Sequence, residues 1–197
     1  MDDLELEKSW QLFNSPHSAE WMSVSFQEVP LGEYVIYIKT RNHPESTSAI
    51  TPRMESELQI TEDLLPAFVL ACEVMIKNMR SSPAPTTAYD AFPEIEVMRY
   101  GTDACFLIER YKRTFLIRYC ANINDVKTLS RTQGLHVLDK EAHFPIKICI
   151  ELNDSFKFMQ LLGYARQTLH ELKRKRYEGR NFSLFPEVGL RLDFETE

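Results

Sequence analysis

The sequence predicts an α+β fold: a tandem pair of units, each a four-stranded antiparallel sheet plus a helix, packed as an intramolecular pseudo-dimer. Strand-like segments followed by an amphipathic helical segment occur twice along the 197 residues, at 21–80 and at 94–178. Residues 81–93 contain three prolines and no regular period, which is typical of a linker. The halves are alike in element order rather than in amino-acid identity. A sheet with a helix on one face leaves its other face bare, and pairing of two units covers it.

Composition and charge favour a folded intracellular protein. Hydrophobic residues make up 44% and aromatic residues 11% of the chain, enough to bury a core and to exclude a disordered protein. No apolar run approaches the roughly 18 residues of a membrane span, and the acidic N-terminus is unlike a signal peptide. We therefore expect a cytoplasmic or nuclear protein. The net charge of −6 is segregated, because residues 1–90 carry 6 basic and 14 acidic side chains whereas residues 91–197 carry 17 and 15.

The first half is predicted to contain a short helix, three strands and a long helix. Within residues 1–20, an amphipathic helix is expected at 2–13, because Leu6, Trp10 and Phe13 recur at i, i+4 and i+7. Segments of β-rich, alternating character predict strands at 21–29, 33–41 and 56–61. A helix then runs to about residue 80, and its apolar stripe comprises Leu65, Val69, Cys72, Ile76 and Met79.

The second unit is predicted to contain four strands, at 94–100, 104–110, 113–121 and 146–152. Asn153 and Asp154 suit a helix N-terminus, and the helix after them is expected to end near Gly179. Its apolar stripe comprises Phe158, Leu162, Ala165, Leu169 and Leu172. Residues 179–197 form either an extra strand or an acidic aromatic tail.

Motifs for catalysis and for metal binding are missing from the sequence. Glycine-rich phosphate loops, nucleophile elbows, HExxH and zinc-type spacings do not occur, and the five histidines are dispersed. The four cysteines lack CxxC spacing and lie in apolar stretches, which predicts buried thiols rather than a disulfide scaffold. We therefore expect no cofactor, no metal and no catalytic residue.

Residues 104–119 interleave aromatic and basic side chains in a predicted hairpin. If the turn is at Tyr111 and Lys112, Phe106 and Phe115 share one face with Arg110 and Arg113. Unstacked bases need flat rings to stack on and cations near their phosphates, so such a face suits single strands. The alternative is that the same aromatic residues form core under the helix, which leaves Arg99 or Tyr100, Arg118 and Lys147 on the outer face. The sequence does not decide between these two faces.

The candidate nucleic-acid contacts come from both alternatives, and none of them is a catalytic or metal-binding residue. They are Arg99, Phe106, Arg110, Lys112, Arg113, Phe115, Arg118, Tyr119 and Lys147. The first half repeats the combination of rings and cations in more acidic surroundings, at Trp21, Phe26, Tyr34, Tyr37, Lys39 and Arg41. The run Lys173 to Arg176 is a further basic cluster, but cations are also favoured at a helix C-terminus.

The second half resembles the family of purine-rich-element-binding (PUR) repeats, whose fold is shared by plant Whirly proteins and positive-cofactor-type transcription coactivators. Three segments carry the resemblance: 105–109, 113–118, and 148–152 running into the helix at 156–169. It covers roughly residues 94–172, with a weaker echo in 21–80. The resemblance implies a curved four-stranded sheet followed by a helix, paired with a second copy, that binds single-stranded DNA or RNA.

Three functional hypotheses from different classes follow. The first is a non-enzymatic protein that binds single-stranded DNA or RNA through a basic-aromatic sheet face. The alternative is a protein-interaction or regulatory module of the same fold without nucleic-acid binding, which contacts its partner through the N-terminal helix or the C-terminal tail. Exposed sheet edges make a homodimer plausible under either hypothesis. An enzyme whose catalytic residues are distant in sequence is a third hypothesis.

Overall fold

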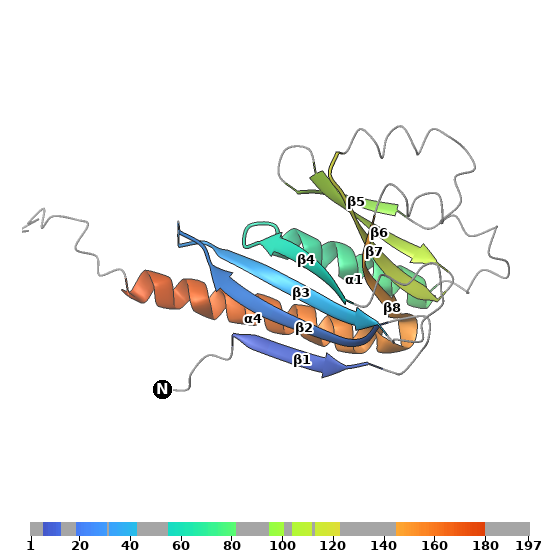
Figure 1. Ribbon diagram of the computed structural model, residues 1–197, viewed down its shortest axis with the longest axis horizontal. Helices are drawn as coiled ribbons and strands as arrows, with labels where there is room; N and C mark the ends of the chain where they lie inside the picture. Colours follow the sequence, from blue (N-terminus) through green and yellow to red (C-terminus); the bar gives the residue numbers. More distant parts are fainter. Residues whose placement is uncertain are drawn as a thin grey trace, which may run out of the picture.

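The chain folds into two antiparallel sheets and two long helices (Figure 1). The computed structural model describes residues 6–12, 19–30, 32–42, 55–81, 95–100, 104–111, 113–122 and 145–179, with the backbone alone at 95–100, 104, 111 and 179. The elements in chain order are β1 (Glu7–Gln11), β2 (Ala19–Glu28), β3 (Tyr34–Asn42), β4 (Glu55–Thr61), α1 (Leu65–Ser81), β5 (Ile95–Tyr100), β6 (Ala104–Tyr111), β7 (Thr114–Cys120), β8 (Ile146–Glu151), a 3-10 turn (Leu152–Asp154) and α4 (Ser155–Gly179). The predicted α+β class is confirmed.

Each sheet is a meander of four neighbouring strands, β1-β2-β3-β4 in the first and β5-β6-β7-β8 in the second. In β2, β3 and β4, buried apolar residues recur at every second position over part of each strand, as at Met22 and Val24, Ile36 and Ile38, and Leu58 and Ile60. Successive strand residues point to opposite faces, so this alternation buries one face and leaves the other to solvent. The apolar stripes predicted for the two helices are buried as well.

The N-terminal segment corrects one expectation. Residues 7–11 form strand β1, in which Glu7 lies opposite Ser25 and Gln11 opposite Trp21, so the predicted helix is wrong over the described residues 6–12. The spacing of Leu6 and Trp10 also fits a strand with its even positions turned inward. Pairing with β2 satisfies backbone groups that would otherwise stand at an open sheet edge, and this outweighs a short helix of weak propensity.

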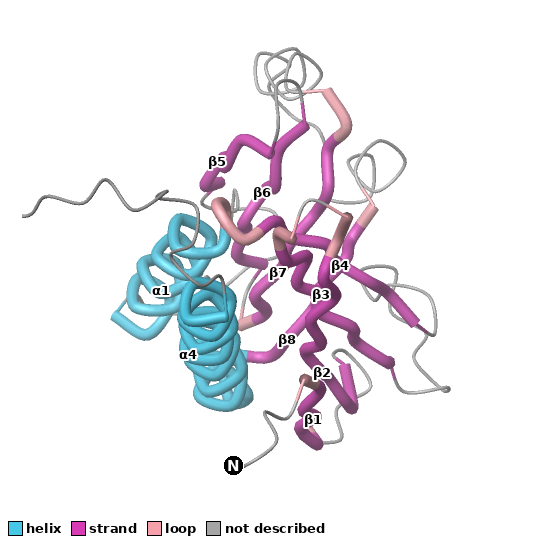
Figure 2. Tube along the Cα trace, turned by 90° about the vertical axis from the view of Figure 1, so that its left-hand side faces the viewer, coloured by secondary structure: helices cyan, strands magenta, loops and turns pink. Residues whose placement is uncertain are grey.

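Both helices lie on the same side of the two sheets and run next to each other (Figure 2). Helix α1 follows the first sheet but packs on the second, where Phe68 meets Phe106 edge to face with ring centroids 5.6 Å apart. Helix α4 packs on its own sheet through Phe158, whose ring lies 5.4 Å from that of Phe115. It also reaches β1, where Tyr164 packs against Trp10. A single core therefore includes residues of both sheets and both helices.

The C-terminal end of α4 is fastened to the first sheet through Glu62, in the turn before α1. Lys173 Nζ and Arg176 Nη2 each lie 3.1 Å from Glu62 Oε1. Arg176 also donates to the Gly32 carbonyl oxygen, and the Tyr34 N–H donates to Glu62 Oε2 at 2.9 Å. Two members of the predicted basic cluster therefore join elements of the fold instead of lying in open solvent.

The β6–β7 hairpin has a different register from the predicted one. Arg110 lies opposite Phe115 and Tyr111 opposite Thr114, which moves the turn by one residue, to 112–113. Each strand residue nevertheless stays on its predicted face, because this change slides the pairing by two positions and the side-chain period of a strand is two. Lys112 itself lies outside the described residues, as do the predicted linker beyond Ser81 and the tail beyond Gly179.

Candidate nucleic-acid interface

On the helix-side face of the second sheet, the described aromatic side chains of β6 and β7 are largely enclosed. Phe106 and Phe115 are 0% and 1% exposed and contact Phe68 and Phe158 of the two helices. A base cannot stack on rings that are already packed inside the core, so the prediction that Phe106 and Phe115 bind bases is wrong. Tyr119 is half-buried, 6.2 Å from the Phe106 ring, and packs against the same core.

On the opposite face, the described side chains of β6 and β7 are buried too. Arg118 and Glu109 have fully buried side chains and form an ion pair, with Arg118 Nε 2.8 Å from Glu109 Oε2. Leu116, Ile146 and Cys149 form a small apolar cluster on this face. The prediction that Arg118 contacts phosphates is therefore also wrong, because its charge is buried and already paired.

The remaining candidates of the second half do not form one open surface within the described residues. Arg110 is buried, with 8% of its surface exposed. Arg113 is exposed near the turn and donates to Asn153 Oδ1 at 3.3 Å. Lys147 is half-buried on β8, and its carbonyl oxygen accepts a hydrogen bond from Thr40 Oγ1 at 3.2 Å. Arg99 lies in β5, where only the backbone is described, and Lys112 lies outside the described residues.

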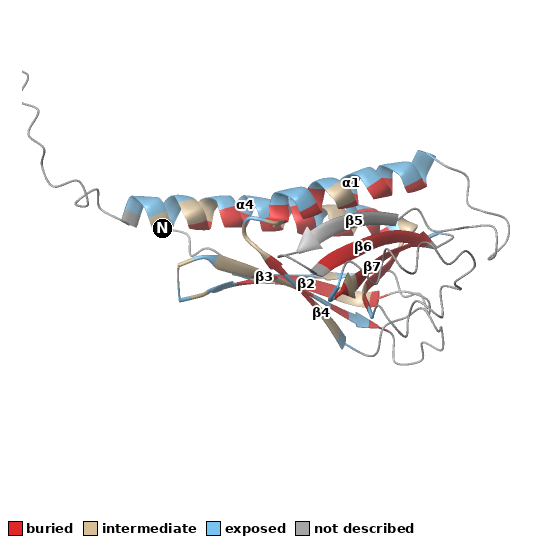
Figure 3. Ribbon diagram, turned by 90° about the horizontal axis from the view of Figure 1, so that it is seen from above, coloured by how far each residue is buried: buried red, intermediate tan, exposed pale blue. Residues whose placement is uncertain are grey.

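The first sheet presents a solvent-facing surface, which the described side chains of β6 to β8 do not form. The face away from the helices consists of side chains that the strand pairing places in rows, because directly opposite residues share a face. We call it the open face, and its rows are Gln11, Trp21, Arg41 and Glu55; then Ser9, Ser23, Lys39 and Glu57; then Glu7, Ser25, Tyr37 and Gln59. Figure 3 shows the contrast, with β6 buried along its length while β3 also carries exposed and intermediate residues.

Trp21 and Arg41 form the best-defined unit of the open face. The Arg41 guanidinium carbon lies 5.3 Å from the centre of the Trp21 ring, within the range of a cation–π contact. Its Nη2 also lies 3.1 Å from Glu55 Oε1 on the neighbouring strand. The Arg41 and Glu55 side chains are 52% and 72% exposed, so water and ligands reach both.

Lys39 and Tyr37 extend this unit along β3. Lys39 Nζ lies 3.5 Å from Glu57 Oε2, and Gln59 Nε2 donates to Glu57 Oε1 at 3.0 Å. Tyr37 is half-buried in the next row. Two rings and two cations therefore share one solvent-facing surface, together with three carboxylates at Glu7, Glu55 and Glu57. Such a surface can stack two bases and contact phosphates, but its own glutamates compete for the cations.

A signal in the sequence distinguishes the two sheets. Of the six residues that the sequence groups together in the first half, four lie on the open face: Trp21, Tyr37, Lys39 and Arg41. The other two do not, because Phe26 is buried and the Tyr34 ring centre lies 5.5 Å from the guanidinium carbon of Arg176. Strands β2 and β4 alternate apolar and polar residues over most of their length, whereas β6 and β7 contain the apolar runs 104–108 and 115–117. Alternation is typical of a sheet with one solvated face, and continuous apolar runs are typical of a sheet buried on both faces.

The described residues contain no group of three or more side chains able to hold a metal ion. No described helix is long and apolar enough to cross a membrane. The four cysteines are buried thiols, as predicted, and burial raises the pKa of Cys72 well above its ordinary value. No family model and no curated protein matches the sequence.

Proposed function

We propose that this chain is a non-enzymatic protein that binds single-stranded DNA or RNA on the open face of its first sheet. The observation that carries the proposal is the Trp21–Arg41 unit, with Tyr37 and Lys39 beside it on the same solvent-facing strands. Each of these rings can stack an unpaired base, and the cations between them can contact phosphates of the same strand. Paired bases in a duplex do not offer these faces, so single strands are the expected ligand.

We also propose that the two sheet-plus-helix units form an intramolecular pseudo-dimer of the PUR, Whirly and positive-cofactor type. The repeated element order supports this proposal. The exchange of helix contacts supports it too, because Phe68 of α1 packs on the second sheet and Tyr164 of α4 packs on the first. The two units have then diverged, since only the first keeps an open face among the described residues.

The carboxylates on the open face set the expected strength of binding. Exposed ion pairs such as Lys39–Glu57 contribute about 0–1 kcal/mol each, so a phosphate can replace the glutamate. Two phosphate contacts on a single strand predict that log K falls against log salt with a slope of about −1.4. We therefore expect modest affinity that falls about 25-fold for each tenfold rise in salt concentration.

Fluorescence anisotropy of labelled single-stranded oligonucleotides at low salt tests the proposal. We expect K39E/R41E to abolish binding, and Trp21→Ala to weaken it about 5- to 150-fold, the equivalent of one lost base stack. The matched control is R166E/R174E, which makes the same charge change at exposed positions of α4 on the helix side of the molecule. Circular dichroism of each variant verifies the fold.

Two results contradict the proposal. One is the absence of binding by the unmodified protein at low salt. The other is an equal loss of affinity in R166E/R174E, because that would mean that overall charge rather than the open face attracts the oligonucleotide.

The second candidate function is a protein-interaction or regulatory module of the same fold that binds no nucleic acid. The excess of carboxylates on the open face favours it, as do two exposed apolar residues one turn apart on α1, Leu70 at 61% and Val74 at 41%. The predicted partner contact through an N-terminal helix does not apply, because residues 7–11 form strand β1. The oligonucleotide titration distinguishes the two functions. Sedimentation of L70S/V74S beside the unmodified protein tests whether α1 mediates a homodimer.

A further inference from the structure

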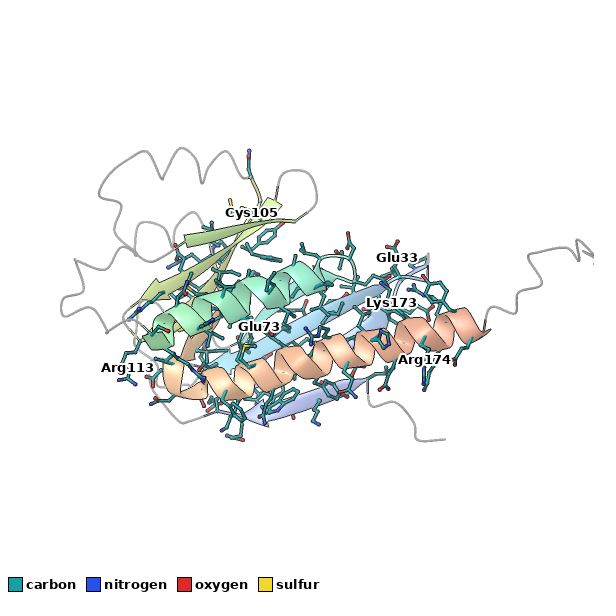
Figure 4. The ribbon with its side chains drawn as sticks, turned by 180° about the vertical axis from the view of Figure 1, so that it is seen from behind. Glu33, Glu73, Cys105, Arg113, Lys173 and Arg174 are labelled. Atoms are coloured by element: carbon teal, nitrogen blue, oxygen red, sulfur yellow. The ribbon has the colours of Figure 1, made fainter. Side chains whose placement is uncertain are left out.

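Two cysteines face each other at the end of the β6–β7 hairpin that is remote from its turn. Cys105 on β6 lies directly opposite Cys120 on β7, at the first and last positions of their paired segments. Figure 4 shows Cys105 at the end of its strand, far from Arg113 at the turn. Directly opposite residues in antiparallel strands have Cα atoms about 4.5 or 5.5 Å apart, and both spacings fall within the range of disulfides.

The two thiols already interact. A hydrogen bond joins the Cys105 and Cys120 side chains, and Cys120 Sγ lies 2.9 Å from the Asn122 carbonyl oxygen. Both residues are buried, at 0% and 1% exposed. Burial, followed by the charge and the hydrogen bond of Cys120, raises the pKa of the Cys105 thiol to about 12. The two thiols are thus neighbours across the strand pair, but in a protonated form that reacts slowly, because the thiolate is the reactive species.

The other two cysteines are too far away to form a disulfide with Cys105 or Cys120. Cys149 lies opposite Leu116, four residues along β7 from Cys120, a separation of about 13 Å at the rise of a strand. Cys72 is buried in α1, in the core between helices and sheets, whereas Cys105 and Cys120 are on the opposite face of the second sheet. Of the four cysteines, one pair therefore has disulfide geometry.

We propose that Cys105 and Cys120 form a dithiol site that small disulfides such as oxidised glutathione convert to an intrachain disulfide. One cysteine thiolate attacks the glutathione disulfide and releases the first glutathione thiolate. The second cysteine thiolate then attacks the mixed disulfide and releases the second. Glutathione gains the two electrons, the two cysteine protons end on the two glutathione thiols, and the protein loses two hydrogen atoms.

Access to the buried pair comes from its position at the strand ends. Strand ends open locally at a lower free-energy cost than the whole molecule, so the thiols become exposed without global unfolding. The disulfide closes the chain between 105 and 120 and holds together the end of the hairpin opposite its turn. Closure of a loop of this length should raise the thermal unfolding midpoint by roughly 5–10 °C.

Mass spectrometry of the full chain tests the inference. The reduced protein is incubated in glutathione buffers of increasing oxidised fraction, alkylated, and measured intact and after digestion. We expect a loss of two mass units, two remaining alkylation sites, and a linked peptide pair containing Cys105 and Cys120. The thermal midpoint should rise on oxidation and return to its starting value with dithiothreitol.

Serine variants provide the controls. C105S and C120S should each lose the linked product, whereas C72S and C149S should still form it. The mapping on unmodified protein decides the question even if a variant does not fold. Four alkylated cysteines at full oxidation, a stable glutathione adduct, or a linked pair that includes Cys72 or Cys149 would each overturn the proposal.

Discussion

The ion pair between Glu109 and Arg118 is the residue-scale feature with the largest expected effect on stability. Both side chains are fully buried, and Arg118 Nε lies 2.8 Å from Glu109 Oε2. Burying two charges costs several kcal/mol of desolvation per ion, which the mutual attraction offsets only while both partners are present. The pair therefore adds little net stability, but neither residue can be replaced alone without a large loss of stability.

Replacing one partner of this pair should lower the free energy of unfolding far more than replacing both partners. We expect Glu109→Leu to lower the free energy of unfolding by about 3–5 kcal/mol, because it leaves the Arg118 charge buried without its carboxylate. The double variant E109L/R118M should recover most of that loss. Urea denaturation of the two variants measures both effects.

A surface pair supplies the comparison for this experiment. Lys39→Gln breaks the exposed Lys39–Glu57 contact and should change the free energy of unfolding by less than about 1 kcal/mol. If Glu109→Leu lowers the free energy of unfolding no more than Lys39→Gln does, water reaches the Glu109–Arg118 pair and the assignment of a buried pair is wrong.

At the scale of elements, Glu62 couples the end of α4 to the first sheet and to the start of α1. Burial by itself raises the pKa of this carboxyl, but the Tyr34 N–H, Arg176 and Lys173 outweigh it and hold the pKa below its ordinary value of 4.5. A carboxyl whose pKa is lower in the folded state stabilises the fold above its unfolded pKa. That contribution is lost as the pH falls through the folded pKa.

Glu62→Gln should therefore destabilise the protein in a pH-dependent way. We expect the variant to have a lower urea midpoint than the unmodified protein at pH 7. The difference should be constant down to about pH 5 and shrink as the pH falls below 4.5, where Glu62 of the unmodified protein becomes protonated. Urea denaturation from pH 7 to pH 3 measures this trend.

Glu178→Gln is the matched control on α4. Its carboxylate is 65% exposed and 3.7 Å from Arg174, so its loss should have almost no effect at any of these pH values. A difference between Glu62→Gln and the unmodified protein that grows toward pH 3 would contradict the assignment of Glu62 as the coupling residue.

At the scale of the whole molecule, both sheets and both helices share one core. Phe68 of α1 has its aromatic partner in the second sheet, and Tyr164 of α4 has its partner in the first. Cutting the chain in the linker separates each helix from contacts that it makes with the other half. The two units are therefore not expected to be independent folding domains.

Calorimetry of the full chain should show one cooperative unfolding transition. Fragments 1–90 and 91–197 should each lack cooperative unfolding by circular dichroism, and mixing them should restore part of it. Two separate transitions in the full chain, or a fragment that unfolds cooperatively by itself, would contradict a shared core.

Local patterns were sufficient for several parts of this structure. Periodicity predicted α1 and α4, their buried stripes and seven of the eight strands, because helices and strands differ in side-chain period over a few residues. The faces of the β6–β7 hairpin were also predictable, since a shift of two residues preserves them. The prediction of β1 failed because Leu6 and Trp10 fit both periods, so their spacing does not show that this segment pairs with the edge of β2.

By itself the sequence determined the α+β class, the order of the elements from β2 onward and the residues of each strand that share a face, since these depend on interactions between near neighbours. The tertiary structure decided which faces meet water, a choice that the pattern within single strands favours but does not fix. Phe106, Phe115 and Arg118 are enclosed, whereas Trp21, Tyr37, Lys39 and Arg41 lie on the open face. The physical reason is that burial depends on what packs above a face, and the residues that cover it come from other parts of the chain.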